Sequence, residues 1–113
     1  ENIIKCLEAK EYNIKKVVKN GVFSGGFIYP GTKAMSETYT KISSALDYEF
    51  NYNLDLDIMP KNSQDAISYG YLKLLYIEVM SHNMEVIITG GDAKKLQHIF
   101  HDAKIDNELL FNS

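Results

Sequence analysis

Two patterns of hydrophobic and polar residues run along the chain, one with the spacing of strands and one with the spacing of helices. β-Branched residues predict a strand over residues 15–19, and an apolar run predicts another over residues 22–29. The Asn20-Gly21 pair between them is typical of a two-residue hairpin turn. Two adjacent glycines inside the second strand, Gly25 and Gly26, indicate a bulge or a close approach of another backbone.

Helical spacing predicts three helices in the first eighty or so residues. The first covers residues 1–12, within an N-terminal segment, residues 1–14, that is assigned to no domain. The second covers residues 31–46, with Thr32 as its N-cap and one buried apolar face. The third, over residues 63–81, is the longest.

This long helix is apolar over most of its circumference. Asn62 or Ser63 is its expected N-cap, because both side chains can accept a hydrogen bond from a free N–H group of the first turn. A helix that is apolar on more than one face is buried on more than one side. In a small domain the simplest second cover is another subunit, and Gly70 would allow close packing there.

The remaining segments complete an α/β arrangement. Residues 47–62 show no clear period, so they form either an edge strand or an extended loop. A β-branched strand is expected over residues 84–89, followed by a helix over residues 93–101 and a short strand over residues 106–111. No repeat, low-complexity tract or linker divides the chain, so we expect a single domain.

Composition narrows the functional classes. The chain has 113 residues, of which 45% are hydrophobic and 24% charged, the balance of a soluble globular domain. A net charge of −3 argues against nucleic-acid binding, which usually needs a basic surface. The single cysteine, Cys6, excludes an internal disulfide and fits a reducing cytoplasm. The longest apolar run, residues 69–80, is too short to span a membrane, and no secretory signal is visible.

Two glycine turns are candidate ligand sites. Residues 24–32 read as a strand, a Pro30-Gly31 turn and the start of a helix, where free N–H groups could bind a phosphate. Gly90-Gly91 follows the strand over residues 84–89, at the kind of strand end where α/β proteins bind ligands. An ordinary turn between a strand and a helix would also explain each of these stretches, and it is the preferred interpretation of either one taken alone.

Other residues give weaker indications of a functional site. The Ser63 hydroxyl could bind a substrate, although a helix cap would also explain it. His98 and His101 could face a metal together, but they lack a third ligand at suitable spacing, so solvated histidines are the preferred interpretation. Asp55 and Asp57 fit a solvated acidic edge, and no catalytic or metal-binding residue is assigned in this chain.

Three ordered motifs resemble those of type III pantothenate kinases. They are Gly25-Gly26-Phe27-Ile28-Tyr29-Pro30-Gly31, then Lys61-Asn62-Ser63-Gln64-Asp65-Ala66, then Thr89-Gly90-Gly91-Asp92-Ala93. The resemblance implies a ribonuclease H-like, actin-like ATPase fold of the acetate and sugar kinase superfamily. Residues 15–113 would form most of its second, C-terminal domain, incomplete at both ends. It further implies a cytoplasmic homodimer that phosphorylates pantothenate with ATP, with Mg²⁺ and a monovalent cation such as K⁺ or NH₄⁺.

The resemblance also implies roles for individual residues. Ser63 matches a threonine that contacts the substrate, and Gly90 and Gly91 match the turn on the adenosine side of the nucleotide. The family's glycine-containing strand and turn correspond to Gly25, Gly26 and Gly31, which would also border the nucleotide.

The departures from the family pattern concern catalysis. The Asp-x-Gly-Asn-Thr phosphate loop and the Gly-x-Asp-Arg motif with its catalytic aspartate are absent from this chain. Residues 8–12 read Glu-Ala-Lys-Glu-Tyr where the family has an Asp-x-Gly-(Thr/Ser)-Ala phosphate motif. We therefore expect the parent protein to be a kinase and the isolated chain to be inactive. The alternative is a non-catalytic interaction or regulatory domain on the same scaffold.

Overall fold

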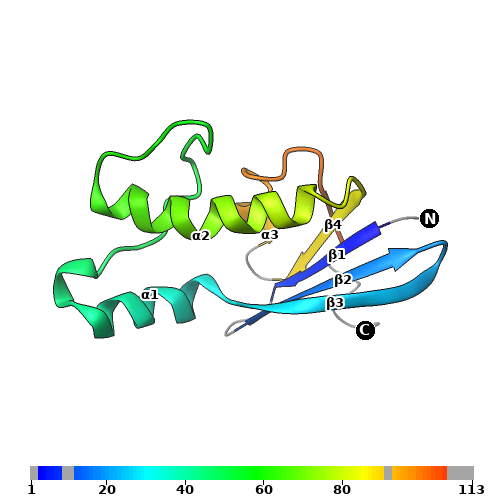
Figure 1. Ribbon diagram of the computed structural model, residues 1–113, viewed down its shortest axis with the longest axis horizontal. Helices are drawn as coiled ribbons and strands as arrows, with labels where there is room; N and C mark the ends of the chain where they lie inside the picture. The colour runs from blue at the N-terminus through cyan, green and yellow to red at the C-terminus, as the bar shows by residue number, and fades with distance from the viewer. Residues whose placement is uncertain (1–2, 9–11, 91–92, 107–113) are drawn as a thin grey trace.

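The computed structural model describes residues 3–8, 12–90 and 93–106, in which five strands form one mixed sheet (Figure 1). The strand order is β3-β2-β1-β4-β5. β1, β2 and β3 pair antiparallel, whereas β4 runs parallel to β1 and β5 runs parallel to β4. The strand bounds are β1 Ile3–Glu8, β2 Tyr12–Lys19, β3 Val22–Pro30, β4 Glu85–Gly90 and β5 Lys104–Ile105.

Three helices accompany the sheet, α1 Thr32–Ile42, α2 Ser63–Met80 and the short α3 Ala93–Leu96, with a 3-10 turn at Ser44–Leu46. The long helix α2 lies across the sheet, and its first turns extend beyond the strand ends together with α1 (Figure 1). The core joins side chains of β1 and β4 to those of α2 and of the segment that begins with α3. Its most buried members are Ile4, Cys6, Leu72, Leu75, Val79, Ile88 and Leu96.

The β2–β3 hairpin confirms the prediction made for its turn and its glycines. Asn20 and Gly21 both have positive φ, 52° and 75°, as a two-residue hairpin turn requires. The pairing of β2 with β3 shifts in register opposite Gly25, whose φ is 109°. A Cβ on Gly26 would lie 2.1 Å from the carbonyl oxygen of Lys15. The glycine pair therefore serves both a bulge and a close backbone approach.

The helix expected over residues 1–12 is wrong, because Ile3–Glu8 forms the strand at the centre of the sheet. Each residue of β1 pairs with β2 on one side and with β4 on the other. A strand covered on both faces is apolar along most of its length rather than alternating, so its pattern can also fit a helix. Residues 3–8 therefore share one sheet with the rest of the chain.

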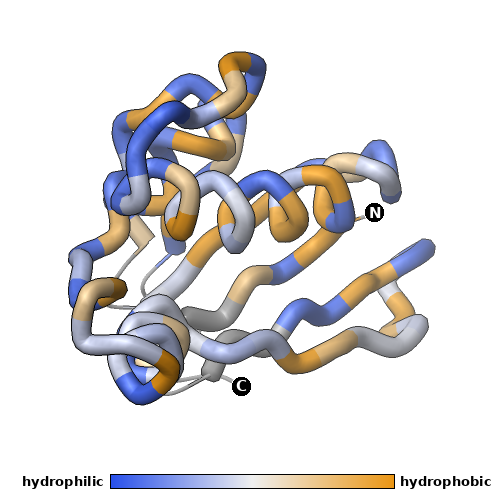
Figure 2. Tube along the Cα trace, turned by 60° about the vertical axis from the view of Figure 1, so that its left-hand side comes forward, coloured by the Kyte–Doolittle hydropathy of each residue, from blue (hydrophilic) through white to orange (hydrophobic). Residues whose placement is uncertain are grey.

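Other boundaries moved as well. The helix expected over residues 31–46 ends at Ile42, and its N-cap is Gly31 rather than Thr32, with no hydrogen bond from a capping side chain. No residue of α1 is fully buried, and the Ile42 side chain is 70% exposed, but Met35 packs against the core, so the predicted face is buried only in part. Figure 2 shows hydrophobic residues at intervals along α2 and along the β2–β3 hairpin.

The C-terminal part is shorter in its regular elements than expected. α3 ends at Leu96, before the predicted residue 101, and the last described strand is Lys104–Ile105. Most of the strand expected over residues 106–111 lies outside the described residues. Residues 47–62 contain no strand, which confirms the extended loop of the two alternatives.

Candidate functional site

Three strands end at the same edge of the sheet. β3 and β1 both run antiparallel to β2, so they point the same way, and β4 is parallel to β1. Glu8 at the end of β1 pairs with Gly90 at the end of β4, and Pro30 ends β3 one residue further along. In α/β proteins the carboxyl ends of parallel strands are the usual place for a ligand.

A pocket of about 810 Å³ lies beside this edge. Thr32 and Lys33 contribute to it from the first turn of α1, and Gln64 from the first turn of α2. Lys95 and His98, from α3 and the residues after it, form another side. The loop before α2 supplies the remaining wall through residues 49–53. Two amines, one imidazole, the Glu49 carboxylate, and several amides and hydroxyls line this space, which suits a polar ligand.

Tyr52 connects three parts of the pocket. Its hydroxyl donates a hydrogen bond to Oγ1 of Thr32 at 2.8 Å, which ties the loop to the start of α1. The ammonium of Lys95 lies 5.8 Å from the centre of the Tyr52 ring, within the range of a cation–π contact. Thr32 thus serves as an anchor for the loop and not as the helix cap that its position suggests.

Polar side chains of the first two turns of α2 hold the loop that precedes the helix. Nε2 of Gln64 donates to the carbonyl of Glu49 at 3.1 Å. The backbone N–H of Asn51 donates to Oγ of Ser68 at 2.7 Å, and Ser68 is fully buried. A carboxylate oxygen of Asp65 accepts from Nδ2 of Asn51 at 3.0 Å. These contacts fix the pocket wall relative to α2.

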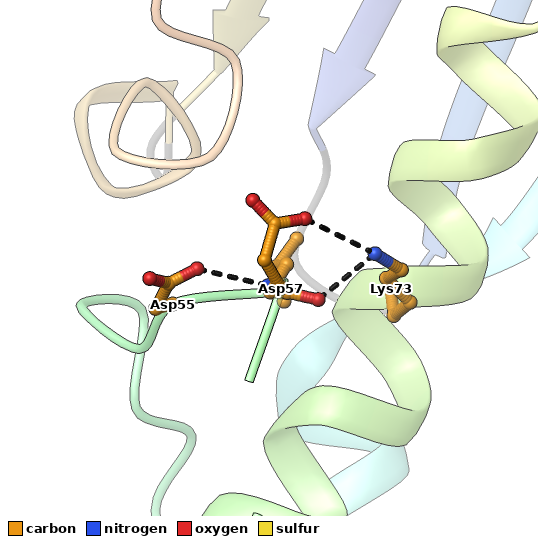
Figure 3. A network of polar contacts seen from close by, with 4 residues as sticks. Asp55, Asp57 and Lys73 are labelled. Carbon is orange, nitrogen blue, oxygen red and sulfur yellow. Dashed lines mark hydrogen bonds and ion pairs between the residues drawn. The ribbon is translucent and has the colours of Figure 1, made fainter. Parts of the chain in front are cut away.

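Lys73 fastens the same loop further along (Figure 3). Its ammonium donates to the carbonyl of Leu56 at 2.8 Å and lies 3.8 Å from a carboxylate oxygen of Asp57. Asp55 turns the loop at this point, because its carboxylate accepts from the backbone N–H of Asp57 at 2.8 Å. The two aspartates therefore lie in a loop and not at a strand edge, and the Asp57 side chain is 94% exposed, as expected for a solvated carboxylate.

Ser63 is the first residue of α2, and its neighbour Asn62 is the N-cap. Oδ1 of Asn62 accepts from the backbone N–H of Asp65 at 2.9 Å. The cap interpretation of Ser63 is therefore wrong. Within the described part of the chain, the exposed Ser63 hydroxyl forms no hydrogen bond, so it remains available to a ligand.

The predicted glycines fall in different places. Gly31 is buried where β3 joins α1, next to the pocket residue Thr32. Gly90 ends β4 with a φ of 113°, and Gly91 lies outside the described residues. The structure does not bring Gly25 and Gly26 to the pocket, since they lie in the bulge about 13–16 Å along β3 from its end.

The two histidines border one hollow. His98 and His101 both line a hollow of about 510 Å³ together with Asp55, and His98 also lines the 810 Å³ pocket. Across residues 3–8, 12–90 and 93–106, no group of three or more His, Cys, Asp or Glu side chains is arranged to hold a metal ion. Nor does any helix in these ranges have the length and apolar character needed to cross a membrane.

Sequence reasoning missed the loop-holding residues. Gln64 and Asn51 gave no periodic signal, because each makes its contact across a loop without regular structure. The available signal was the Asn62-x-x-Asp65 spacing, which is similar to a capping box and indicates that Asn62, rather than Ser63, is the N-cap.

Comparison with known proteins shows which proteins this chain resembles. No model of a known protein family matches the chain. It is 58% identical over 95 residues to the type III pantothenate kinase of Sulfurimonas denitrificans and 39% identical over 99 residues to that of Campylobacter hominis. These matches cover 84% and 86% of this chain but only 46% and 48% of the two relatives, so the chain spans about half their length.

One solved structure is also similar to nearly the whole of this chain. A conserved Campylobacter jejuni protein, provisionally described as a Baf family transcriptional activator, matches with a TM-score of 0.82 and 30% identity. The match covers 98% of this chain and 53% of that one. The resemblance carried by the three motifs is thus confirmed: the chain is homologous to about half the length of the type III pantothenate kinases, consistent with their C-terminal portion.

Proposed function

We propose that this chain is the C-terminal portion of a type III pantothenate kinase, which transfers a phosphoryl group from ATP to pantothenate to give 4'-phosphopantothenate in coenzyme A biosynthesis. The observation that supports this proposal most directly is the 58% identity, over 84% of the chain, to a relative of that name. The enzyme would work in the cytoplasm. The sheet order, with three antiparallel strands followed by two parallel ones, supports the actin-like ATPase fold that the family resemblance implies.

Ser63 and the strand ends would serve opposite parts of the reaction. The free hydroxyl of Ser63 would bind pantothenate, and Gly90, together with Gly91 and Gly31, would let the nucleotide approach the backbone at the sheet edge. Phosphoryl transfer depends mainly on positioning and on stabilising charge around the γ-phosphate. Because the phosphate-loop and catalytic-aspartate motifs are absent from this chain, it would supply one wall of the cleft and no catalytic residue.

The family resemblance also implies two kinds of cation. Mg²⁺ would neutralise charge on the ATP phosphates, and K⁺ or NH₄⁺ would bind nearby, by family resemblance. The described residues do not fit a metal site, because no suitable group of three ligands is present among them. No step of the reaction is therefore assigned to a metal held by this part of the chain.

A homodimer would complete the protein. Three apolar side chains of α2 are exposed, Leu74 by 62%, Ile77 by 52% and Met80 by 45%, and they recur at helical spacing on the side away from the core. Gly70 lies one turn before Leu74, and the space around its Cβ position is open. A second copy of the chain would cover this stripe and remove it from water.

A chimera tests the proposed activity. This chain would replace the matching segment of the Sulfurimonas denitrificans kinase, both unchanged and with the substitutions Glu8→Asp, Lys10→Gly, Glu11→Thr and Tyr12→Ala. These restore the family's phosphate motif, so we expect pantothenate-dependent ADP release from the restored chimera and none from the unchanged one. A folded restored chimera without activity, beside an active parent kinase, would overturn the proposal.

A regulatory function is the second candidate, because the similar solved structure is described as a transcriptional activator. Residues 8–12, which depart from the family's phosphate motif, agree with it. Complementation separates the two functions: the restored chimera should rescue a bacterial strain that lacks pantothenate kinase. A regulatory domain would fail to rescue growth while remaining folded and expressed.

A further inference from the structure

Ser63 lies between two residues that are held in place, and it is itself free. On one side, both polar atoms of the Asn62 side chain contact Asp65, at 2.9 Å to the backbone nitrogen and 3.0 Å to Oδ2. On the other, Nε2 of Gln64 donates to the carbonyl of Glu49 in the pocket wall. The Ser63 backbone is therefore fixed from both neighbours.

The Asp65 carboxylate links this position to the pocket wall. Its Oδ2 accepts from Asn62, the residue before Ser63, and its Oδ1 accepts from Nδ2 of Asn51 at 3.0 Å. Both partners present an N–H group, so both carboxylate oxygens are needed as acceptors. These hydrogen bonds, first the one from Asn51 and then the one from Asn62, lower the pKa of Asp65, so the side chain is ionised at neutral pH.

Asn51 carries the link into the pocket. Its backbone N–H donates to the buried Ser68 hydroxyl, and its Oδ1 accepts from the backbone N–H of Asn53 at 3.0 Å. Asn51 and Asn53 both line the 810 Å³ pocket, whereas Asp65 does not. A substitution at Asp65 would therefore affect a ligand in this pocket indirectly, through Asn51.

We propose that Asp65 is a positioning residue, which holds Ser63 at a fixed place relative to the pocket wall at Asn51. The inference rests on the proposed function, and it adds a residue that acts on pantothenate through Ser63. Pantothenate binding would then depend on the carboxylate at residue 65, whereas binding of ATP at the strand ends would not.

Kinetics of the restored chimera test the role. Asp65→Asn keeps the size of the side chain but leaves one acceptor for two donors, so we expect about a tenfold fall in kcat/KM for pantothenate with the KM for ATP unchanged. In a Ser63→Ala background the same change should have little further effect, because residues that act through one another are not additive. Equal losses in the two backgrounds, or a rise in the KM for ATP, would overturn the proposal.

Lys73→Met is the matched control. It removes a different contact that holds the loop, at Leu56 and Asp57, without touching the residues beside Ser63. We expect the KM for pantothenate to stay within about twofold of that of the restored chimera. An effect as large as that of Asp65→Asn would show that any loosening of the loop suffices, and would overturn a specific role for Asp65.

Amide hydrogen exchange of the 113-residue chain tests the link without activity. Asp65→Asn should speed exchange of the Asn51 N–H several-fold and leave the N–H of Leu75, in the buried part of α2, unchanged. Unchanged exchange at Asn51 would overturn the inference even if the chimera is an active kinase. Faster exchange beside an inactive restored chimera would support the positioning link and reject the proposed function.

Discussion

The hydroxyl of Tyr71 in α2 donates a hydrogen bond to the backbone carbonyl of Pro30, the last residue of β3. The Tyr71 ring also meets Tyr29 and Phe50 edge to face, with ring centres 5.4 Å and 5.3 Å apart. This contact fixes α2 against the edge where the strands end. Ser63 begins the helix eight residues earlier, about 12 Å further along its axis. The position of Ser63 relative to the end of β3 is therefore set by α2.

Tyr71→Phe should lower the free energy of unfolding by about 0.5–1.5 kcal/mol, because it removes a part-buried hydrogen bond to the Pro30 carbonyl while the ring contacts remain. Urea denaturation followed by circular dichroism measures this difference. Tyr69→Phe is the control on the same helix, since the Tyr69 hydroxyl has no hydrogen bond among the described residues. Equal stability of the Tyr71 and Tyr69 variants would contradict the role given to the Pro30 contact.

Gly26→Ala should destabilise the fold by about 1–3 kcal/mol, since its Cβ would meet the Lys15 carbonyl oxygen at 2.1 Å and backbone must move. Gly70→Ala is the opposite case. Its Cβ would meet nothing within 4 Å, and alanine should gain up to about 1 kcal/mol in a helix. Thermal unfolding of both variants checks the pair. A stabilised Gly26 variant would show that the bulge does not need the close approach described here.

Stability should fall in acid partly through Asp65. Its pKa is lower in the folded than in the unfolded chain, owing to the hydrogen bonds from Asn51 and Asn62. The contribution is present above the unfolded-state pKa, near 4, and is lost as the pH falls through the lower folded-state value. Unfolding measured between about pH 6 and pH 2.5 should show a shallower acid slope in Asp65→Asn than in the native sequence. Parallel slopes would count against the network.

Ile77→Lys should convert the proposed dimer to a monomer without altering the fold, because it places a charge on the exposed apolar stripe of α2. Sedimentation equilibrium measures the mass, and circular dichroism confirms the fold. Ile58→Lys is the matched control, since Ile58 is 61% exposed but lies in the loop before α2. A native chain that is monomeric at high concentration would reject the dimer outright.

Local chemistry made several parts of this protein predictable from sequence. The Asn20-Gly21 turn requires positive φ that few other residue pairs accept, so its hairpin followed directly. The adjacent glycines of β3 predicted the bulge, because Gly25 has a positive φ there and Gly26 lies close to the Lys15 carbonyl. The long helix α2 was predicted within one residue at its end, because its cap, length and apolar residues all agree.

Contacts between distant segments decided the rest. The sequence Ile3–Glu8 fits a helix or a strand, and only pairing with β2 and β4 on its two sides makes it the centre of the sheet. The freedom of the Ser63 hydroxyl likewise depends on Asn62 taking the cap. The pocket wall depends on Asn51 reaching Asp65 and Ser68 across a loop. Hydrogen bonds between residues far apart in sequence leave no periodic trace, so the tertiary structure alone determined how this site is arranged.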